Sequence, residues 1–183
     1  MSVGWILLLV VALLALFGLY LSITAGRLDQ LNRRVETSRH SLDTQLLRRL
    51  SLSSDLAGSG LLDPVSSLLL ADAARAVRTA PTSDAGARDL AESNLSEVLR
   101  AIFATPEDVA QLRALPGGAP LANEMDAVTR RVEMARRFLN DGVRANRDVR
   151  NQRFVRWFRL AGTSVEPPTV ELDDAPPPGF GSR

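Results

Sequence analysis

Few side chains in this 183-residue chain have the types and spacing that catalysis or metal binding requires. His40 is the only histidine and cysteine is absent, so a zinc site would have to combine one imidazole with carboxylates, a poor match to zinc. A Ser-His-Asp arrangement would also depend on His40, and no G-x-S-x-G turn is present. The chain has no lysine and neither glycine-rich motif that holds nucleotide phosphates. We therefore predict a non-enzymatic protein with no catalytic residue, metal site or cofactor, and a surface position for His40.

One polar cluster, formed by Asp43, Gln45, Arg48 and Arg49, lies within about one and a half to two helical turns and flanks an apolar stripe. Ion pairs on one helix surface, or a bridge to a second helix, explain such a cluster more simply than a ligand site does. Asn140 lies beside the apolar stripe of a later helix, where it either hydrogen-bonds across to the helix of Asp43 or is solvated. We predict that these five residues make polar contacts between helices.

Arginine is concentrated between residues 121 and 160, which carry ten arginines against five acidic residues, although the net charge of the chain is only +1. Such a stripe could bind an anionic lipid surface, nucleic acid or an acidic partner, or could simply be solvated. Nucleic acid is not expected, because Phe154, Trp157 and Phe158 have the spacing of a helical core rather than of a stacking platform. The candidate interaction or lipid face consists of Arg144, Arg147, Arg150, Arg153, Arg156 and Arg159.

The element that would anchor the whole chain is an apolar run from Val3 to Ile23, which contains no charged residue. At about 1.5 Å per residue it makes a helix of about 32 Å, which matches the hydrocarbon thickness of a bilayer. Fourteen of its residues are Leu, Ile, Val or Phe, and together they favour insertion by about 6 kcal/mol. We predict a transmembrane helix that embeds Val3 to Ile23 in membrane lipid.

Two alternatives to a membrane anchor are a cleaved signal peptide and a buried core helix. Small residues at 24–26 could suit a signal peptidase, but the first three residues carry no positive side chain. The run is also longer than the apolar stretch of a signal peptide, which has about 7 to 15 residues. A core helix of a small soluble domain would show a polar face, which this run lacks. An uncleaved anchor is the better interpretation.

The arginines around the run indicate its orientation. None precedes the run, whereas Arg27, Arg33, Arg34 and Arg39 follow it closely. Positive residues beside a membrane helix stay on the cytoplasmic side. We therefore expect a single-pass protein of the plasma membrane, with a short extracytoplasmic N-terminus (1–2), a transmembrane helix (3–23) and a cytoplasmic body.

Apolar residues at spacings of three and four predict amphipathic helices in the body. The long ones cover 27–57, 61–80, a third segment around 90–103, and 121–160. The first could continue directly from the apolar run, since Gly26 is the only breaker between them. A short helix should begin at Pro106, with Thr105 as its N-cap, and the segment 116–120 should separate it from the last helix. In the second helix the stripe consists of Leu61, Leu62, Val65, Leu68, Leu69, Ala73, Ala76 and Val77.

Such helices bury their stripes only by packing together, so we predict an all-α fold in which residues 27–161 form an antiparallel four-helix bundle with long first and last helices. Residues 162–183 differ, because they hold half of the ten prolines and few large apolar residues. They predict an extended or disordered, Pro-rich acidic tail. Its acidic residues, Glu166, Glu171, Asp173 and Asp174, suggest that it folds back onto the basic end of the last helix.

Two blocks of the body resemble the LemA family of membrane-anchored bacterial proteins. The first resembles the family pattern N..V......ID.QL.RR..L...L through Asn32, Val35, Leu42, Asp43, Gln45, Leu46, Arg48, Arg49, Leu52 and Leu56. The second resembles the ARRFYN..V signature through Ala135, Arg136, Arg137, Phe138, Asn140 and Val143, with Leu139 in place of the usual tyrosine. The resemblance implies a helical bundle on a single-pass anchor with a cytoplasmic body. It implies no biochemical activity.

Taken together, the sequence predicts a membrane-anchored scaffold whose body contacts a partner protein or a second copy of itself. The alternative is a module that senses or remodels anionic membranes through the arginine-rich end of the last helix.

Overall fold

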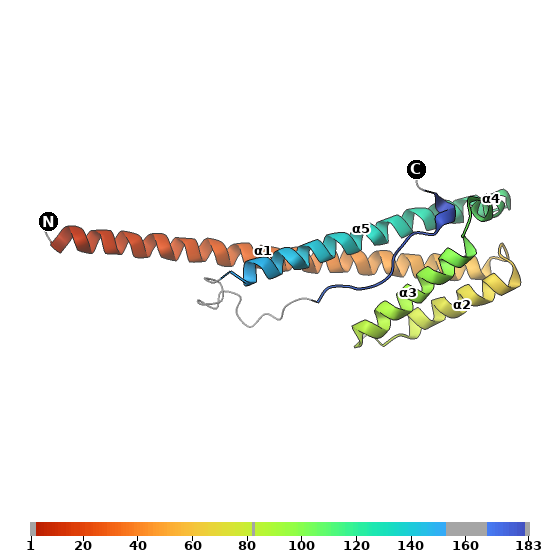
Figure 1. Cartoon of the computed structure of the whole chain (residues 1–183), viewed down its shortest axis with the longest axis horizontal. Helices are drawn as coiled ribbons and strands as arrows, with labels where there is room; N and C mark the ends of the chain where they lie inside the picture. Colours follow the sequence, from red (N-terminus) through yellow and green to blue (C-terminus); the bar gives the residue numbers. More distant parts are fainter. Residues whose placement is uncertain (1–2, 82, 153–167, 182–183) are drawn as a thin grey trace. The chain divides into compact units, whose positions relative to one another are not determined.

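The computed structural model describes residues 3–81, 83–152 and 168–181. Within these ranges the chain forms five α-helices and one short 3₁₀ helix, without any strand (Figure 1). The elements are α1 (Val3–Gly58), α2 (Pro64–Thr79), α3 (Ala85–Ile102), α4 (Pro106–Ala114), α5 (Gly118–Arg150) and η1 (Pro178–Phe180). The all-α class predicted from the apolar stripes is confirmed.

Helix α1 continues without a break from the apolar run into the amphipathic segment that follows. Gly26 lies inside it, because one glycine costs a helix only about 1 kcal/mol and the residues on both sides favour the helix. Residues 4–20 are exposed in the folded chain. Among the described residues, α1 is the one helix long and apolar enough to cross a membrane.

The described residues divide into two compact units. The first unit holds α1 up to Thr37 and α5 from Asn140 onward. Here Leu28 and Val149 are buried together, with Leu31 packed against them. The fully buried Asn146 donates its Nδ2 to Asn32 Oδ1 at 2.7 Å. In this unit an apolar contact and an amide contact therefore join α1 to α5.

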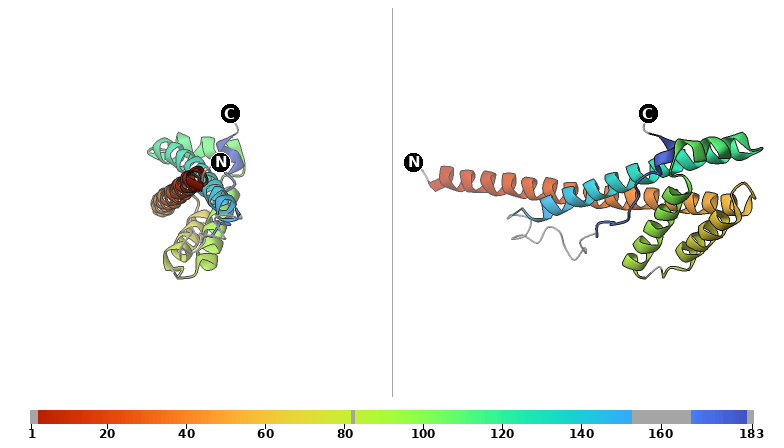
Figure 2. Two further views of the ribbon diagram at one scale, coloured as in Figure 1. Left: turned by 90° about the vertical axis from the view of Figure 1, so that its left-hand side faces the viewer. Right: turned by 45° about the vertical axis from the view of Figure 1, so that its right-hand side comes forward.

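The second unit holds Ser38–Leu139 and the tail from Thr169 onward. Helices α2 and α3 lie side by side in it, and η1 contacts α4 (Figure 2). Its core draws on every helix and on the tail, and consists of Leu52, Leu56, Leu70, Ala73, Leu95, Leu99, Phe103, Val109, Leu112, Ala122, Met125, Val128 and Phe180.

The starts of α2 and α4 follow from local sequence. Asp63 caps α2 by accepting the backbone N–H groups of Val65 and Ser66 at 3.0 and 3.1 Å. Thr105 and Asp108 cap α4 reciprocally, each side chain accepting the backbone N–H of the other residue. The start of α4 predicted from Thr105 and Pro106 is confirmed, since α4 begins at Pro106.

Helix α5 differs at both ends from the predicted segment 121–160. It begins at Gly118, because Pro120 lies in the first turn, where its missing N–H would have had no partner within the helix. The described helix ends at Arg150, and Asn151 and Gln152 form a turn. The remainder of the predicted helix from 153 onward lies outside the described residues.

Of the two alternatives predicted for the tail, residues 168–181 follow the extended one, and the prediction of disorder is wrong for them. Phe180 belongs to the apolar core of the second unit, and Leu172 is also buried. Apart from η1 the segment has no regular secondary structure. Two large apolar side chains and a few paired charges are therefore enough to order a proline-rich segment.

Candidate functional site

The most deeply buried polar contact of the second unit joins α1 to α3. Arg49 Nη2 lies 2.7 Å from Glu92 Oε2, and Arg49 Nη1 donates to Ser96 Oγ at 2.9 Å. The side chains of Arg49 and Glu92 are only 1% and 2% exposed, so each charge depends on the other for compensation. The Nε of Arg49 is buried without a hydrogen-bond partner among the described residues. The contact thus restricts how α1 packs against α3, although the Nε donor of Arg49 is left without an acceptor among the described residues.

The other predicted polar residues occupy different environments. Asp43 accepts from Arg88 of α3 at 2.9 Å, and Arg48 forms an ion pair with Glu124 of α5. Both pairs are partly exposed, and such pairs each stabilise a fold by less than about 1 kcal/mol. Gln45 and Asn140 are half-buried. Asp43, Arg48 and Arg49 therefore each contact a helix other than their own, and none of the three pairs with another member of the cluster.

Sequence reasoning missed the partners of these residues. Glu92 is three residues before Leu95 on the stripe of α3, and Asn146 is three residues after Val143 on the stripe of α5. The sequence does contain one sign of such a residue, which is a polar side chain at a position of the apolar stripe. Such a side chain is buried with the apolar residues and needs a hydrogen-bond partner there. The sequence does not identify that partner.

The tail binds the second unit mainly through two adjacent carboxylates. Asp173 Oδ2 lies 2.6 Å from Arg100 Nη2 of α3. Asp174 accepts two hydrogen bonds from Arg136 of α5, from Nε at 2.6 Å and from Nη2 at 2.8 Å. The hydrogen bonds that Arg136 donates to Asp174 raise the pKa of Arg136, and the hydrogen bond that Arg100 donates to Asp173 lowers the pKa of Asp173. The described part of the acidic tail thus returns to the body, where its carboxylates meet Arg100 and Arg136. The predicted contact with the basic end of the last helix falls largely on residues 153–167, which lie outside the described residues.

Backbone contacts and one aromatic contact complete the attachment of the tail. The N–H groups of Glu171 and Asp173 donate to Asp89 Oδ2 and Ser93 Oγ of α3. Further along, the rings of Phe180 and Phe103 have centroids 5.1 Å apart. We refer to the residues of the body that hold the tail as the tail-binding face: Asp89, Ser93, Arg100, Phe103, Arg130 and Arg136.

We expect the contribution of Asp173 to stability to disappear in acid. Its pKa is lowered in the folded chain, so the stabilisation is complete above its ordinary value of 3.8 and is lost as the pH falls through the lower folded value. The Asp173 side chain is 48% exposed, so the full contribution is a few tenths to about 1 kcal/mol. The free energy of unfolding of Asp173→Asn should therefore be lower than that of the unchanged chain at pH 7, and the difference should shrink as the pH falls below 3.8. A difference that persists unchanged in acid would contradict this assignment.

An apolar face of α2 is left uncovered. Val65, Leu68 and Leu69 were predicted on the buried stripe, but their side chains are 66%, 67% and 53% exposed. The prediction was wrong for these three residues, whereas Ala73 of the same stripe is buried as expected. Helix α2 also buries Leu70 and Ala74, which were not predicted, so its buried side is rotated away from Val65, Leu68 and Leu69. Positions 65, 68 and 69 share one side of a helix, so they form a continuous patch, the α2 apolar face.

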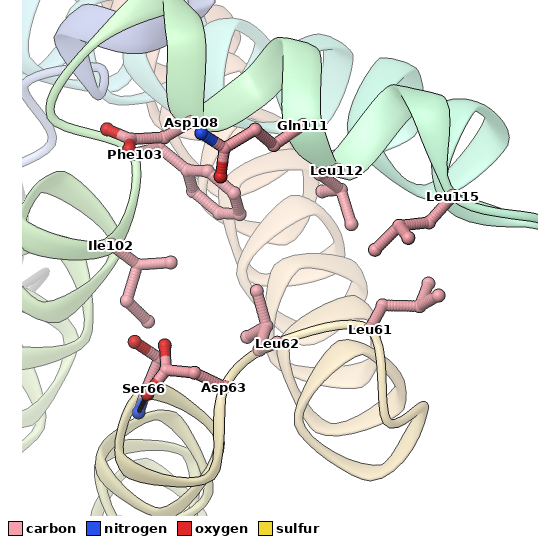
Figure 3. A pocket seen from close by; sticks show the side chains of 10 residues that line it. All are labelled: Leu61, Leu62, Asp63, Ser66, Ile102, Phe103, Asp108, Gln111, Leu112 and Leu115. Atoms are coloured by element: carbon pink, nitrogen blue, oxygen red, sulfur yellow. Dashed lines mark hydrogen bonds between the residues drawn. The ribbon is translucent and has the colours of Figure 1, made fainter.

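A hollow of about 210 Å³ lies where α2, α3 and α4 come together (Figure 3). Two carboxylates at its edge already act as caps, since Asp63 caps α2 and Asp108 caps α4. Hydrogen bonds from the hydroxyl and backbone N–H of Ser66 lower the pKa of Asp63. The four leucines that face each other across the hollow are Leu61, Leu62, Leu112 and Leu115. The hollow is thus a small depression of mixed polar and apolar lining, and its two carboxylates already cap helices.

The candidate lipid face is only partly described. Arg144 and Arg147 are exposed on α5, and Arg144 lies 3.7 Å from Asp141. Arg150 donates to Asn146 Oδ1 at 2.7 Å. The remaining three arginines, Arg153, Arg156 and Arg159, lie outside the described residues.

The described part of the chain shows no group of three acidic or histidine side chains arranged to hold a metal ion. No family model, no curated protein and no solved structure matches this chain. The resemblance to the LemA family therefore stays a prediction from the residues quoted for it.

Proposed function

We propose that this chain is a non-enzymatic, single-pass membrane protein whose helical body binds a partner protein beside the membrane. In this proposal Val3 to Ile23 crosses the plasma membrane with the N-terminus outside, and the body is cytoplasmic. The observation that carries it is the continuity of α1, which passes from an exposed apolar segment of membrane length directly into the helical body. Both segments belong to one helix from Val3 to Gly58 with no loop between them, and this suits a scaffold better than a loose tether.

We also propose that the body is an antiparallel four-helix bundle of the LemA type, in which α4 is a short addition to the four longer helices. The first unit supports this arrangement. Asn32 contacts Asn146, and a Cβ on Gly142 would lie 3.4 Å from the side chain of Val35. Residue numbers thus rise along α1 while they fall along α5, as they do in antiparallel neighbours.

The surface that we assign to the partner is the α2 apolar face. Burying a leucine or valine side chain stabilises a complex by about 1.5 to 3 kcal/mol, so three of them can provide the centre of an interface. The partner should present an apolar surface of its own.

The experiment is a crosslinking pull-down from membranes with the full-length chain. Leu68→Ser combined with Leu69→Ser should lower recovery of the crosslinked partner by about tenfold or more, because two buried side chains are lost from the interface. Leu90→Ser is the matched control, since Leu90 is 63% exposed but lies on α3. Equal recovery with the double variant and the control would contradict the assignment of this face. Recovery of no protein other than the chain itself would favour self-association.

The alternative function is binding of anionic lipid through the end of α5. The exposed Arg144 and Arg147 support it, because basic side chains near a membrane surface each contribute about 1 kcal/mol in anionic leaflets. Sedimentation with vesicles containing phosphatidylserine, but not with neutral vesicles, would favour this alternative over a protein partner.

A further inference from the structure

The contacts of the tail resemble those of a bound peptide. From Glu171 to Gly181 the tail contacts Asp89, Arg100, Arg136, Arg130 and Phe103, which belong to the body of the second unit. The tail passes between an arginine of α3 and an arginine of α5. Asp173 pairs with Arg100 of α3, and the adjacent Asp174 pairs with Arg136 of α5. This part of the face therefore selects two consecutive acidic residues.

The second acidic residue is held more specifically than the first. The side chain of Asp174 is 6% exposed, and it receives two hydrogen bonds from the guanidinium of Arg136. Bidentate pairs of this kind are among the strongest hydrogen bonds and fix geometry as well as charge. Asparagine or serine at this position could not reproduce them.

At the end of the tail, the body leaves no space for a side chain at position 179. Gly179 donates its N–H to the carbonyl oxygen of Phe103 at 2.9 Å. A Cβ at position 179 would lie 2.7 Å from that oxygen and closer still to the carbonyl oxygen of Thr105, so only glycine fits. Phe180 is buried against Phe103, and Arg130 donates to the carbonyl oxygen of Gly181 at 3.0 Å.

We propose that the tail-binding face is a peptide-binding site for segments with two adjacent acidic residues followed by prolines and Gly-Phe, and that the chain's own tail occupies it as a replaceable ligand. The segment of this chain that fits reads Leu-Asp-Asp-Ala-Pro-Pro-Pro-Gly-Phe. Prolines lower the entropy that such a segment loses on binding, because their backbone is already restricted. The site is separate from the α2 apolar face, so it goes beyond the function proposed above.

The test uses the full-length chain in detergent micelles and a fluorescent synthetic peptide of residues 168–183. Gly179→Ala in the protein should release its own tail and leave the site vacant. The peptide should then bind this variant about tenfold or more tightly than it binds the unchanged protein, whose site is already filled. Fluorescence anisotropy measures both affinities, and far-UV circular dichroism checks that the variant keeps its helices.

Two peptide controls test the recognition itself. A peptide with Gly179→Ala should bind the vacant site about tenfold or more weakly, because its Cβ collides with two carbonyl oxygens of the body. A peptide with Asp173→Asn and Asp174→Asn should also bind about tenfold or more weakly, because it loses the charge-assisted hydrogen bonds from Arg100 and Arg136. Equal binding of all three peptides, or no binding to a folded Gly179→Ala protein, would overturn the proposal.

A second vacated protein, with Asp173→Asn and Asp174→Asn in its own tail, covers the case in which Gly179→Ala impairs folding. Tight binding of the peptide to this protein supports the proposal. If both variants lose their helices, the tail is an integral part of the core and the proposal fails.

Discussion

Glu92→Ala should destabilise the helical body by about 3 to 5 kcal/mol, because it leaves the guanidinium of Arg49 buried without a counter-charge. This is a large part of the total stability of a small domain, which is about 5 to 15 kcal/mol. Glu92→Gln should cost less, since the amide oxygen can still accept a hydrogen bond from Arg49. Chemical denaturation followed by far-UV circular dichroism gives both values.

The informative control replaces both partners. Arg49→Met with Glu92→Leu removes both charges, and with them the unsatisfied Nε of Arg49. Replacing buried ion pairs with apolar residues of similar volume is often neutral or stabilising by about 1 to 4 kcal/mol. The double variant should therefore be much more stable than Glu92→Ala. If the double variant is as unstable as the single one, the loss comes from packing and not from the unpaired charge.

The helices themselves could be predicted from the sequence because their causes are local. Leu42 and Leu46 are four positions apart in the predicted helix 27–57, as an apolar stripe requires, and both are buried. The N-cap at Thr105 needed only its own residue type, the following proline and the acidic first turn. Helix periodicity and capping depend on residues within a few positions of each other, and a single sequence contains that information.

What could not be predicted depends on contacts between distant segments. An apolar residue on α2 could face either of two sides, and only the packing of the whole unit selects Leu70 over Leu68 and Leu69. In the same way the cluster at Asp43, Arg48 and Arg49 was visible as a group of charges, but its partners Arg88, Glu124 and Glu92 belong to other helices. Local patterns do not determine the register between helices.

The tail is another segment whose structure depends on contacts with distant residues, which its composition does not reveal. Its composition is typical of disordered segments, which bury too little apolar surface to compensate for the entropy lost on ordering. Composition does not reveal that Phe180 meets Phe103, or that Asp173 and Asp174 meet two arginines. A few specific contacts with a preformed surface can order a segment that would not fold alone.

Leu13→Arg combined with Leu14→Arg should release the chain from membranes. The two residues lie at the centre of the run from Val3 to Ile23, where each arginine costs about 2.5 to 3.5 kcal/mol on insertion. Two such costs offset the roughly 6 kcal/mol by which the apolar residues of the run favour the bilayer. The fraction of the chain that resists carbonate extraction should fall from nearly all to a minor share.

Leu13→Ile with Leu14→Ile is the matched control, because it changes the same positions and keeps the run apolar. It should leave the carbonate-resistant fraction unchanged. Retention of the double arginine variant in membranes would mean that another surface holds the chain there, with the arginines of α5 as the first surface to test. Release of both variants would mean that attachment depends on the packing of this helix against another one, rather than on its transfer into lipid.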